Sequence, residues 1–190
     1  MEPAQEKLNE AGIIVAIDVD NLLISSAEDG QSFKGYDLFS GFKKSIEWIQ
    51  TFGKILCIHF YLPSSQSIND SLWEALIERY KKDFLFETIY CPKRRDEITG
   101  LRIDDVDRHL MDHTKRMVSL FGSRVKYFCL ASGDVDYSPL LWSLKRKRNL
   151  EVAFILGSEK SFSNAYRQMH VASIHPTTGR DLIYYFSPQK

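Results

Sequence analysis

Carboxylates follow closely on two apolar runs of this 190-residue chain. Asp18 comes after the run 13–17, and Asp134 comes shortly after the run 125–131. Both runs are rich in β-branched and aromatic residues, which predicts buried strands. Ligands of open parallel sheets bind outside the carboxyl ends of the strands, so both acids are expected at that edge. Because clustered carboxylates repel one another, we expect a hard cation, Mg²⁺ or Mn²⁺, to neutralise them.

Further acids extend this candidate site: Asp20, Asp136, Asp104, Asp105 and Asp107. The first two are weaker candidates because their side chains are expected to turn away from the site. The last three open a predicted helix, where the helix dipole and N-capping favour acids. Three acids in four positions exceed what capping requires. We therefore expect at least one of them to reach the acidic site.

Polar and basic residues nearby are expected to contact a phosphate substrate: Asn21, Lys93, Arg94, Arg95, Arg102 and Ser132. Most of them lie on the loop 92–103, and long loops of compact domains tend to be functional or mobile. Their cations would hold phosphates beside the metal, with Tyr90 or Tyr137 stacking on a base. A solvated charged surface is the alternative. The basic run 145–148 ends a helix at the opposite edge, where the helix C-terminus favours cations.

Histidines offer a second kind of metal chemistry. Asp105, His109 and His113 recur at the helical spacing i, i+4, and such a set could bind a transition metal. These intervals are common by chance on a helix, so solvated polar side chains are the preferred interpretation. His59 lies in an apolar run and is expected to be a buried core residue with satisfied hydrogen bonds.

Length and composition fit one intracellular domain at residues 11–190, preceded by a polar, disordered segment at 1–10. The formal net charge of +0 means that nucleic acid would have to be bound by local patches. Cys57, Cys91 and Cys129 lie in apolar runs without CxxC spacing, which indicates reduced core thiols. The sequence has neither a signal-peptide pattern nor an apolar membrane span, so we expect a cytoplasmic protein.

The elements that must position these residues alternate along the chain. Strands are predicted at 13–17, 55–62, 84–91, 125–131, 152–156 and 182–186. Helices are predicted at 37–52, 69–82, 104–121, 137–147 and 162–171. Alternating strands and helices imply right-handed crossovers, an α/β fold and a mostly parallel sheet. If strands 13–17 and 125–131 are neighbours, the acids after them face each other across the switch point.

Three segments together resemble the NYN domains of the PIN-like nuclease superfamily: Ile-Asp-Val-Asp-Asn-Leu at 17–22, the acidic helix start at 104–107, and Ser-Gly-Asp-Val-Asp-Tyr-Ser-Pro-Leu at 132–140. The resemblance covers about residues 13–174. It implies a PIN-like three-layer α/β/α sandwich and Mg²⁺- or Mn²⁺-dependent cleavage of RNA.

The same resemblance implies which acids hold the metal. They are Asp18, Asp134 and one acid from the start of the helix, while Asp136 matches the second acid of the motif and joins the catalytic set. Segment 100–105 departs from the Lys-Gly-Val-Asp-like pattern of the family, and Asp105 is the first choice for the third ligand. Cations held there would activate a water for phosphodiester hydrolysis.

The leading hypothesis is therefore a metal-dependent ribonuclease that acts on single-stranded or structured RNA. A haloacid-dehalogenase-type phosphatase is a second hypothesis, since Asp18 and Asp20 mimic the nucleophile motif of that family. A third is a non-catalytic module that binds RNA or a protein. It could pair as a homodimer through the aromatic residues 184–186.

Overall fold

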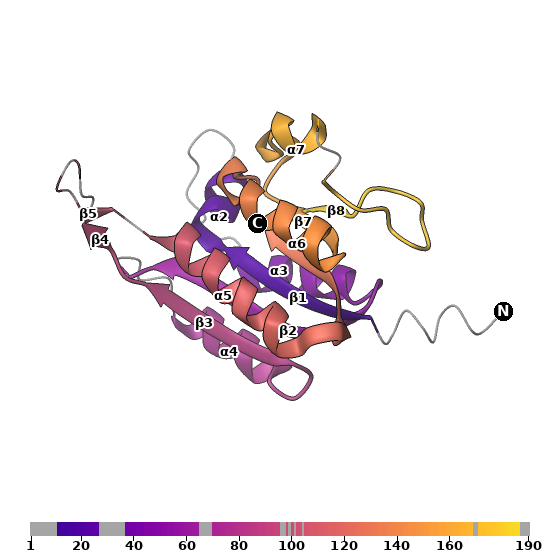
Figure 1. Cartoon of the computed structure of the whole chain (residues 1–190). Helices are drawn as coiled ribbons and strands as arrows, with labels where there is room; N and C mark the ends of the chain where they lie inside the picture. The colour runs from indigo at the N-terminus through magenta and orange to yellow at the C-terminus, as the bar shows by residue number, and fades with distance from the viewer. Residues whose placement is uncertain are drawn as a thin grey trace.

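Six parallel strands form the central sheet of the computed structural model, which describes residues 11–26, 37–64, 70–95, 98, 100, 102–103, 105–168 and 171–186. The strands are β1 (Gly12–Asp18), β2 (Lys54–Pro63), β3 (Leu85–Cys91), β6 (Val125–Ala131), β7 (Glu151–Leu156) and β8 (Ile183–Tyr185). Their order is β3-β2-β1-β6-β7-β8 (Figure 1). The prediction of an α/β fold with a mostly parallel sheet is confirmed. The segment 1–10 and Asp104 lie outside the described residues.

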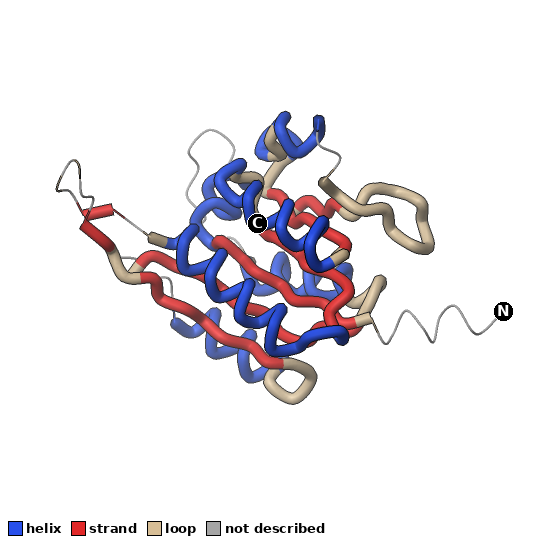
Figure 2. Tube along the Cα trace, viewed as in Figure 1, coloured by secondary structure: helices blue, strands red, loops and turns tan. Residues whose placement is uncertain are grey.

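Helices cover both faces of this sheet (Figures 1 and 2). One face carries α2 (Val19–Ser26), α3 (Leu38–Ile49) and α4 (Asp70–Tyr80), and the other carries α5 (Val106–Phe121), α6 (Ser138–Arg148) and α7 (Asn164–Gln168). Short 3₁₀ turns are η1 (Gly122–Arg124), η2 (Val135–Tyr137) and η3 (Glu159–Ser161). The three-layer α/β/α sandwich is thereby confirmed. None of the described helices is long and apolar enough to cross a membrane.

The strands read as continuous apolar runs because the sheet is buried on both faces. Along β1, Ile13 and Val15 pack in one core cluster with Phe42 of α3. Ile14, the residue between them, packs in the other cluster with Leu110 of α5. The alternation of side chains along a strand thus supplies both cores from one strand. The three cysteines, all within the described residues, are buried thiols that form no disulfide.

The order in which successive strands are added to the sheet reverses between β1 and β6. β1 pairs in parallel with β2 on one side and with β6 on the other, which is the order of a doubly wound sheet. The helices that follow β1 and β6 cover opposite faces of the sheet, which makes the carboxyl ends of these two strands the expected place for a ligand. The chain after each of these strands carries the predicted acids.

The helix α2 and the two short strands of the loop 92–103 were not predicted from the sequence. α2 begins at Val19, immediately after β1, where a loop was expected. Its apolar face consists of little more than Val19 and Leu22, which is too short a pattern to reveal a helix. The loop 92–103 contains the antiparallel pair β4 (Arg94–Arg95) and β5 (Arg102–Ile103), which projects beyond the end of the sheet (Figure 1).

Candidate metal centre

One tyrosine hydroxyl joins two of the candidate acids. Tyr137, at the end of η2, is completely buried, and its Oη lies 2.8 Å from Oδ2 of Asp18 and 2.6 Å from Oδ1 of Asp107. Asp18 ends β1 and Asp107 lies in the first turn of α5. Two carboxylates from residues far apart in the sequence therefore lie beside the switch point between β1 and β6.

The two contacts of Tyr137 leave excess negative charge on Asp18 and Asp107. A phenol has a single proton to donate, so it cannot donate to two ionised carboxylates at once. Either one carboxyl carries a proton or a cation takes up the excess negative charge. Carboxylate oxygens are the ligands that Mg²⁺ and Mn²⁺ prefer, so the residues present fit such an ion.

The acidities of the two carboxyls reflect this crowding. The pKa of Asp18 is raised from 3.8 to about 6. Burial is the main cause and the charges of Asp107 and Asp20 add to it, whereas the hydrogen bonds from Tyr137 and the backbone of Asn21 oppose it. Burial also raises the pKa of Asp107, and so do the nearby charges of Asp134, Asp136 and Asp105. A protein without a cation would hold protons here in mildly acidic solution.

The segment after β6 is held by its own hydrogen bonds. Asp134 caps η2, its Oδ1 accepting from the backbone N–H of Asp136 at 3.0 Å, and its own N–H donates to Oγ of buried Ser132 at 3.2 Å. The hydroxyl of Tyr166 donates to the carbonyl oxygen of Asp134. Asp134 is half-buried and Asp136 is exposed. Asp134 therefore has a structural role as well as a charge that acts on Asp107.

Asn21 links the chain after β1 to the chain after β6. Its Oδ1 accepts from the backbone N–H of Gly133 at 3.3 Å, while its own N–H donates to Oδ1 of Asp18 at 3.2 Å. Gly133 also leaves no space for a side chain, since a Cβ there would lie 1.9 Å from the carbonyl oxygen of Ser161. The backbone after β6 must therefore approach both α2 and η3 closely.

Gly133→Ala is expected to destabilise the protein by about 1–3 kcal/mol, because the backbone of Ser161 would have to move. Chemical denaturation of wild type and variant measures the difference. Wild-type stability in Gly133→Ala would show that this close approach is not needed.

Asp105, the first choice for the third ligand, is engaged elsewhere. Its Oδ1 lies 3.0 Å from Nε of Arg94, and the carboxylate is 11% exposed. This ion pair attaches the β4–β5 pair to the start of α5. The acid that the structure places beside Asp18 is Asp107, two residues further along the helix.

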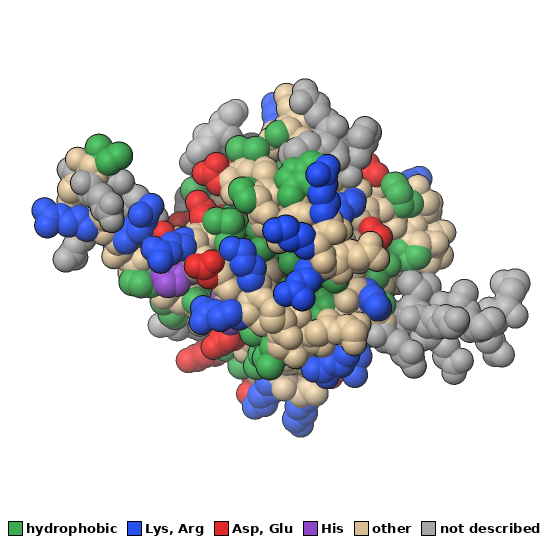
Figure 3. All heavy atoms as spheres, viewed as in Figure 1, with side chains coloured by type: hydrophobic (Ala, Val, Ile, Leu, Met, Phe, Trp, Pro, Cys, Tyr) green, Lys and Arg blue, Asp and Glu red, His purple; other side chains and the backbone are tan. Residues whose placement is uncertain are grey.

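Of the predicted substrate contacts, the four basic residues lie on this projection, whereas Asn21 and Ser132 lie beside the end of β6 and accept hydrogen bonds from backbone N–H groups. Lys93, Arg94 and Arg95 are exposed, and Nε of Arg95 donates to the carbonyl oxygen of Gly100 at 3.1 Å. Arg102 follows in β5, where only its backbone is described. Figure 3 shows Lys and Arg side chains gathered on this part of the molecule. Arg94 contacts the start of α5 through Asp105, and binding of phosphates by these residues stays a prediction.

Two aromatic predictions need correction or refinement. Tyr137 cannot stack on a base, because its ring is fully buried and its hydroxyl is hydrogen-bonded to Asp18 and Asp107. Tyr90 is 48% exposed, and its stacking on a base stays a prediction. Of the aromatic residues suggested for a homodimer, Phe186 is buried and Tyr184 stacks on Trp48 with ring centroids 5.3 Å apart. Tyr185 remains 44% exposed, and the dimer stays a prediction.

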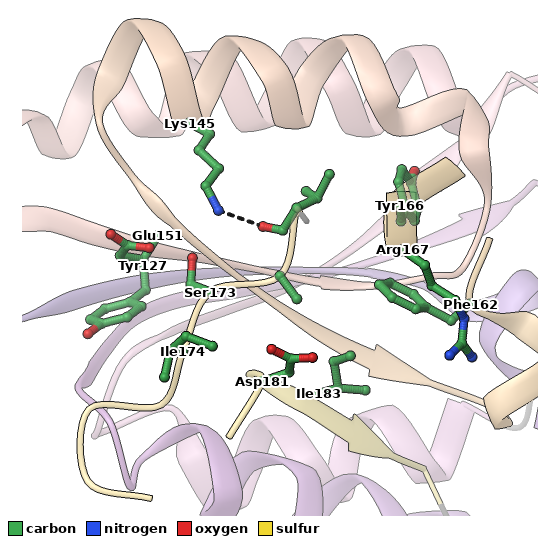
Figure 4. A pocket seen from close by; sticks show the side chains of 12 residues that line it. Tyr127, Lys145, Glu151, Phe162, Tyr166, Arg167, Ser173, Ile174, Asp181 and Ile183 are labelled. Atoms are coloured by element: carbon green, nitrogen blue, oxygen red, sulfur yellow. Dashed lines mark hydrogen bonds between the residues drawn. The ribbon is translucent and has the colours of Figure 1, made fainter. Parts of the chain in front are cut away.

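A cavity of about 750 Å³ lies away from the acids, between α6, β8 and the segment 171–174 (Figure 4). Lys145 borders it and donates to the carbonyl oxygen of Val171 at 2.9 Å. None of Asp18, Asp107 and Asp134 lines this cavity. It is therefore separate from the candidate metal centre.

The doubly wound sheet, the helices on both of its faces and the two carboxylates beside Tyr137 define a three-layer α/β/α domain with acids at its switch point. The model of the NYN domain family matches residues 12–173, and the chain therefore belongs to the NYN domain family. This confirms the resemblance noted in the sequence. The family is generally nuclease-like, with divalent metals and RNA as its usual cofactors and substrates.

Solved structures agree with the fold. A protein of unknown function from Vibrio parahaemolyticus aligns with a TM-score of 0.53 at 18% identity, covering 81% of this chain and 88% of the other. MurG from Acinetobacter baumannii aligns at 10% identity over 94% of this chain and 47% of its own. Its TM-score of 0.41 is too low to indicate a shared fold. A search of curated proteins found no match.

Proposed function

We propose that this protein is a metal-dependent ribonuclease that hydrolyses RNA phosphodiester bonds at the carboxyl edge of β1 and β6. The contact of Tyr137 with both Asp18 and Asp107 carries the proposal, because it gathers two carboxylates whose excess negative charge a cation can neutralise. Membership of a generally nuclease-like family supports the same function. The buried thiols suit a reducing compartment, and we propose the cytoplasm.

The residues have separate roles in this proposal. Asp18 and Asp107 hold the cation with Asp134, and Asp107 takes the place first given to Asp105. Tyr137 fixes the two carboxylates relative to one another. A bound Mg²⁺ or Mn²⁺ would supply a water of lowered pKa and stabilise charge on the phosphate.

The surrounding side chains position the substrate. Arg94 and Arg95 present guanidinium groups on the projecting β4–β5 pair, where they bind phosphates of the RNA backbone. Asp136 is exposed, its charge acts on Asp107, and in this proposal it accepts a proton from the attacking water. Phosphate contacts carry no sequence information, so the RNA is selected by its shape or its single-stranded character.

Purified protein should cleave single-stranded or structured RNA in Mn²⁺ or Mg²⁺ and lose the activity in a chelator. The double variant Asp18→Asn, Asp134→Asn is the control for contaminating nucleases. Cleavage no greater than that of the double variant, across both cations and both RNA types, would refute the proposal. Retention of RNA on a filter without cleavage and without a cation requirement would instead indicate a binding module.

A further inference from the structure

A second group of metal-ligand side chains lies on the sheet beneath α5. His59 in β2, Glu87 in β3 and His113 in α5 each offer one ligand atom, and these atoms lie within 4.8 Å of one another. His59 and Glu87 are partners in the register of β2 and β3, so the strand pairing itself sets them side by side. The ring of His113 meets that of His59 edge to face, with centroids 4.6 Å apart.

We propose that His59, Glu87 and His113 form a binding site for a first-row transition metal ion, with Zn²⁺ as its representative. Two imidazoles and one carboxylate are ligands that Zn²⁺ accepts, with a fourth position left for water. This site goes beyond the ribonuclease proposal and does not depend on it. Mg²⁺ and Mn²⁺ suit the all-carboxylate centre, whereas imidazole nitrogens favour Zn²⁺, Ni²⁺ or Cu²⁺.

The unpaired nitrogen of His59 points to a ligand. His59 is 1% exposed, and its Nε2 has no hydrogen-bond partner within the described part of the chain. The nearest acid is Glu87, whose Oε2 lies 3.6 Å from this nitrogen, too far for a hydrogen bond. His59 is buried as expected, but the expectation that its hydrogen bonds are satisfied is wrong. A buried polar atom without a partner costs free energy, and a metal ion would remove that cost.

The other two ligands can complete the site. Tyr61 places its hydroxyl 2.9 Å from Nδ1 of His113 and so orients the ring, as the second shell of a metal site does. The side chain of Glu87 is 54% exposed, so its carboxylate can approach the ion from solvent. Zn²⁺ ligands at about 2.0–2.1 Å in a tetrahedron lie about 3.4 Å apart. Small rotations of Glu87 and His113 would close the remaining gap.

Both imidazoles are available as neutral ligands near pH 7. Burial lowers the pKa of His59 to about 4, with a further contribution from His113. Burial also lowers the pKa of His113, against the opposing charge of Glu87. Neutral rings keep a lone pair for a metal, whereas protonated rings do not.

The proposed Zn²⁺ site is separate from the aspartate centre, but α5 contributes a residue to each of them. Tyr61, the register partner of Asp18, follows His59 by two residues of the same strand. His113 follows Asp107 by six residues, about 9 Å along α5. A metal at His59, Glu87 and His113 would therefore fasten α5 to β2 and β3, and with it the helix that carries Asp107.

Zn²⁺ titration against a chromogenic chelator, after removal of bound metal, tests the proposal. Wild type should bind one Zn²⁺, and His113→Ala and Glu87→Gln should each weaken binding at least about 100-fold. The matched control is His109→Ala, which removes a histidine one turn away on α5 that is not part of the group. The Asp18→Asn, Asp107→Asn double variant should bind this Zn²⁺ like wild type.

A second readout does not depend on the chelator. Zn²⁺ at about a hundred times its Kd should raise the melting temperature of wild type by about 5–10 °C, and should not raise that of His113→Ala. Circular dichroism of the metal-free variants establishes that they fold. Equal Zn²⁺ affinity in His113→Ala and His109→Ala, or binding abolished only in the aspartate double variant, would overturn the proposal.

Discussion

Asp107→Asn is expected to lower RNA cleavage at least about 100-fold, whereas Asp105→Asn should keep most of it. The structure places the carboxylate of Asp107 with Asp18 on the hydroxyl of Tyr137, while Asp105 is paired with Arg94. The asparagine at position 107 can still accept the hydrogen bond from Tyr137, so the fold should be preserved. Rates of cleavage of a labelled RNA in saturating Mn²⁺ measure the difference.

The two variants control each other, because both remove one negative charge from the same helical turn. Loss of activity that is equal in the two would point to the overall charge of the helix start. Loss in Asp105→Asn alone would restore Asp105 as the third ligand. Thermal unfolding of both variants separates a defect of the site from a defect of folding.

Asp18→Asn is expected to remove a pH dependence of stability. In the metal-free wild type, Asp18 has a pKa of about 6 when folded against 3.8 ordinarily. Its protonated form is therefore favoured by folding. The resulting stabilisation is fully present below pH 3.8 and is lost as the pH rises through about 6, which amounts to about 3 kcal/mol. Asp107 acts in the same direction, because its pKa is also raised.

Urea denaturation between pH 4 and 7 in a chelator measures this effect. The free energy of unfolding of wild type should fall as the pH rises, relative to that of Asp18→Asn. Tyr137→Phe is the second comparison. It removes a hydrogen bond that lowers the pKa of Asp18, so this pKa should rise and the free energy of unfolding should fall at a higher pH than in wild type. Mn²⁺ at pH 7 should stabilise wild type more than Asp18→Asn. Parallel pH profiles for wild type and Asp18→Asn would contradict this account.

The sheet was predictable because its signals are local. Each core strand is an apolar run that buries both faces, and β1 and β6 were predicted to within a residue of their ends. Asp18 and Asp134 could be placed at the carboxyl edge from these runs alone. α2 was missed because it buries only Val19 and Leu22, and the β4–β5 pair because each of its strands is two residues long, so no periodicity reveals them.

The sequence alone therefore determined the fold class, the family and the edge at which the acids lie, since these follow from hydrophobic patterns and one contiguous motif. Only the tertiary structure decided which acid of the helix start meets Asp18, because that depends on how α5 is rotated over the sheet. The same packing buries Tyr137 between the carboxylates and leaves Nε2 of His59 beside Glu87 and His113. Contacts between side chains from different elements depend on distances of a few ångströms, and no spacing along one chain encodes them.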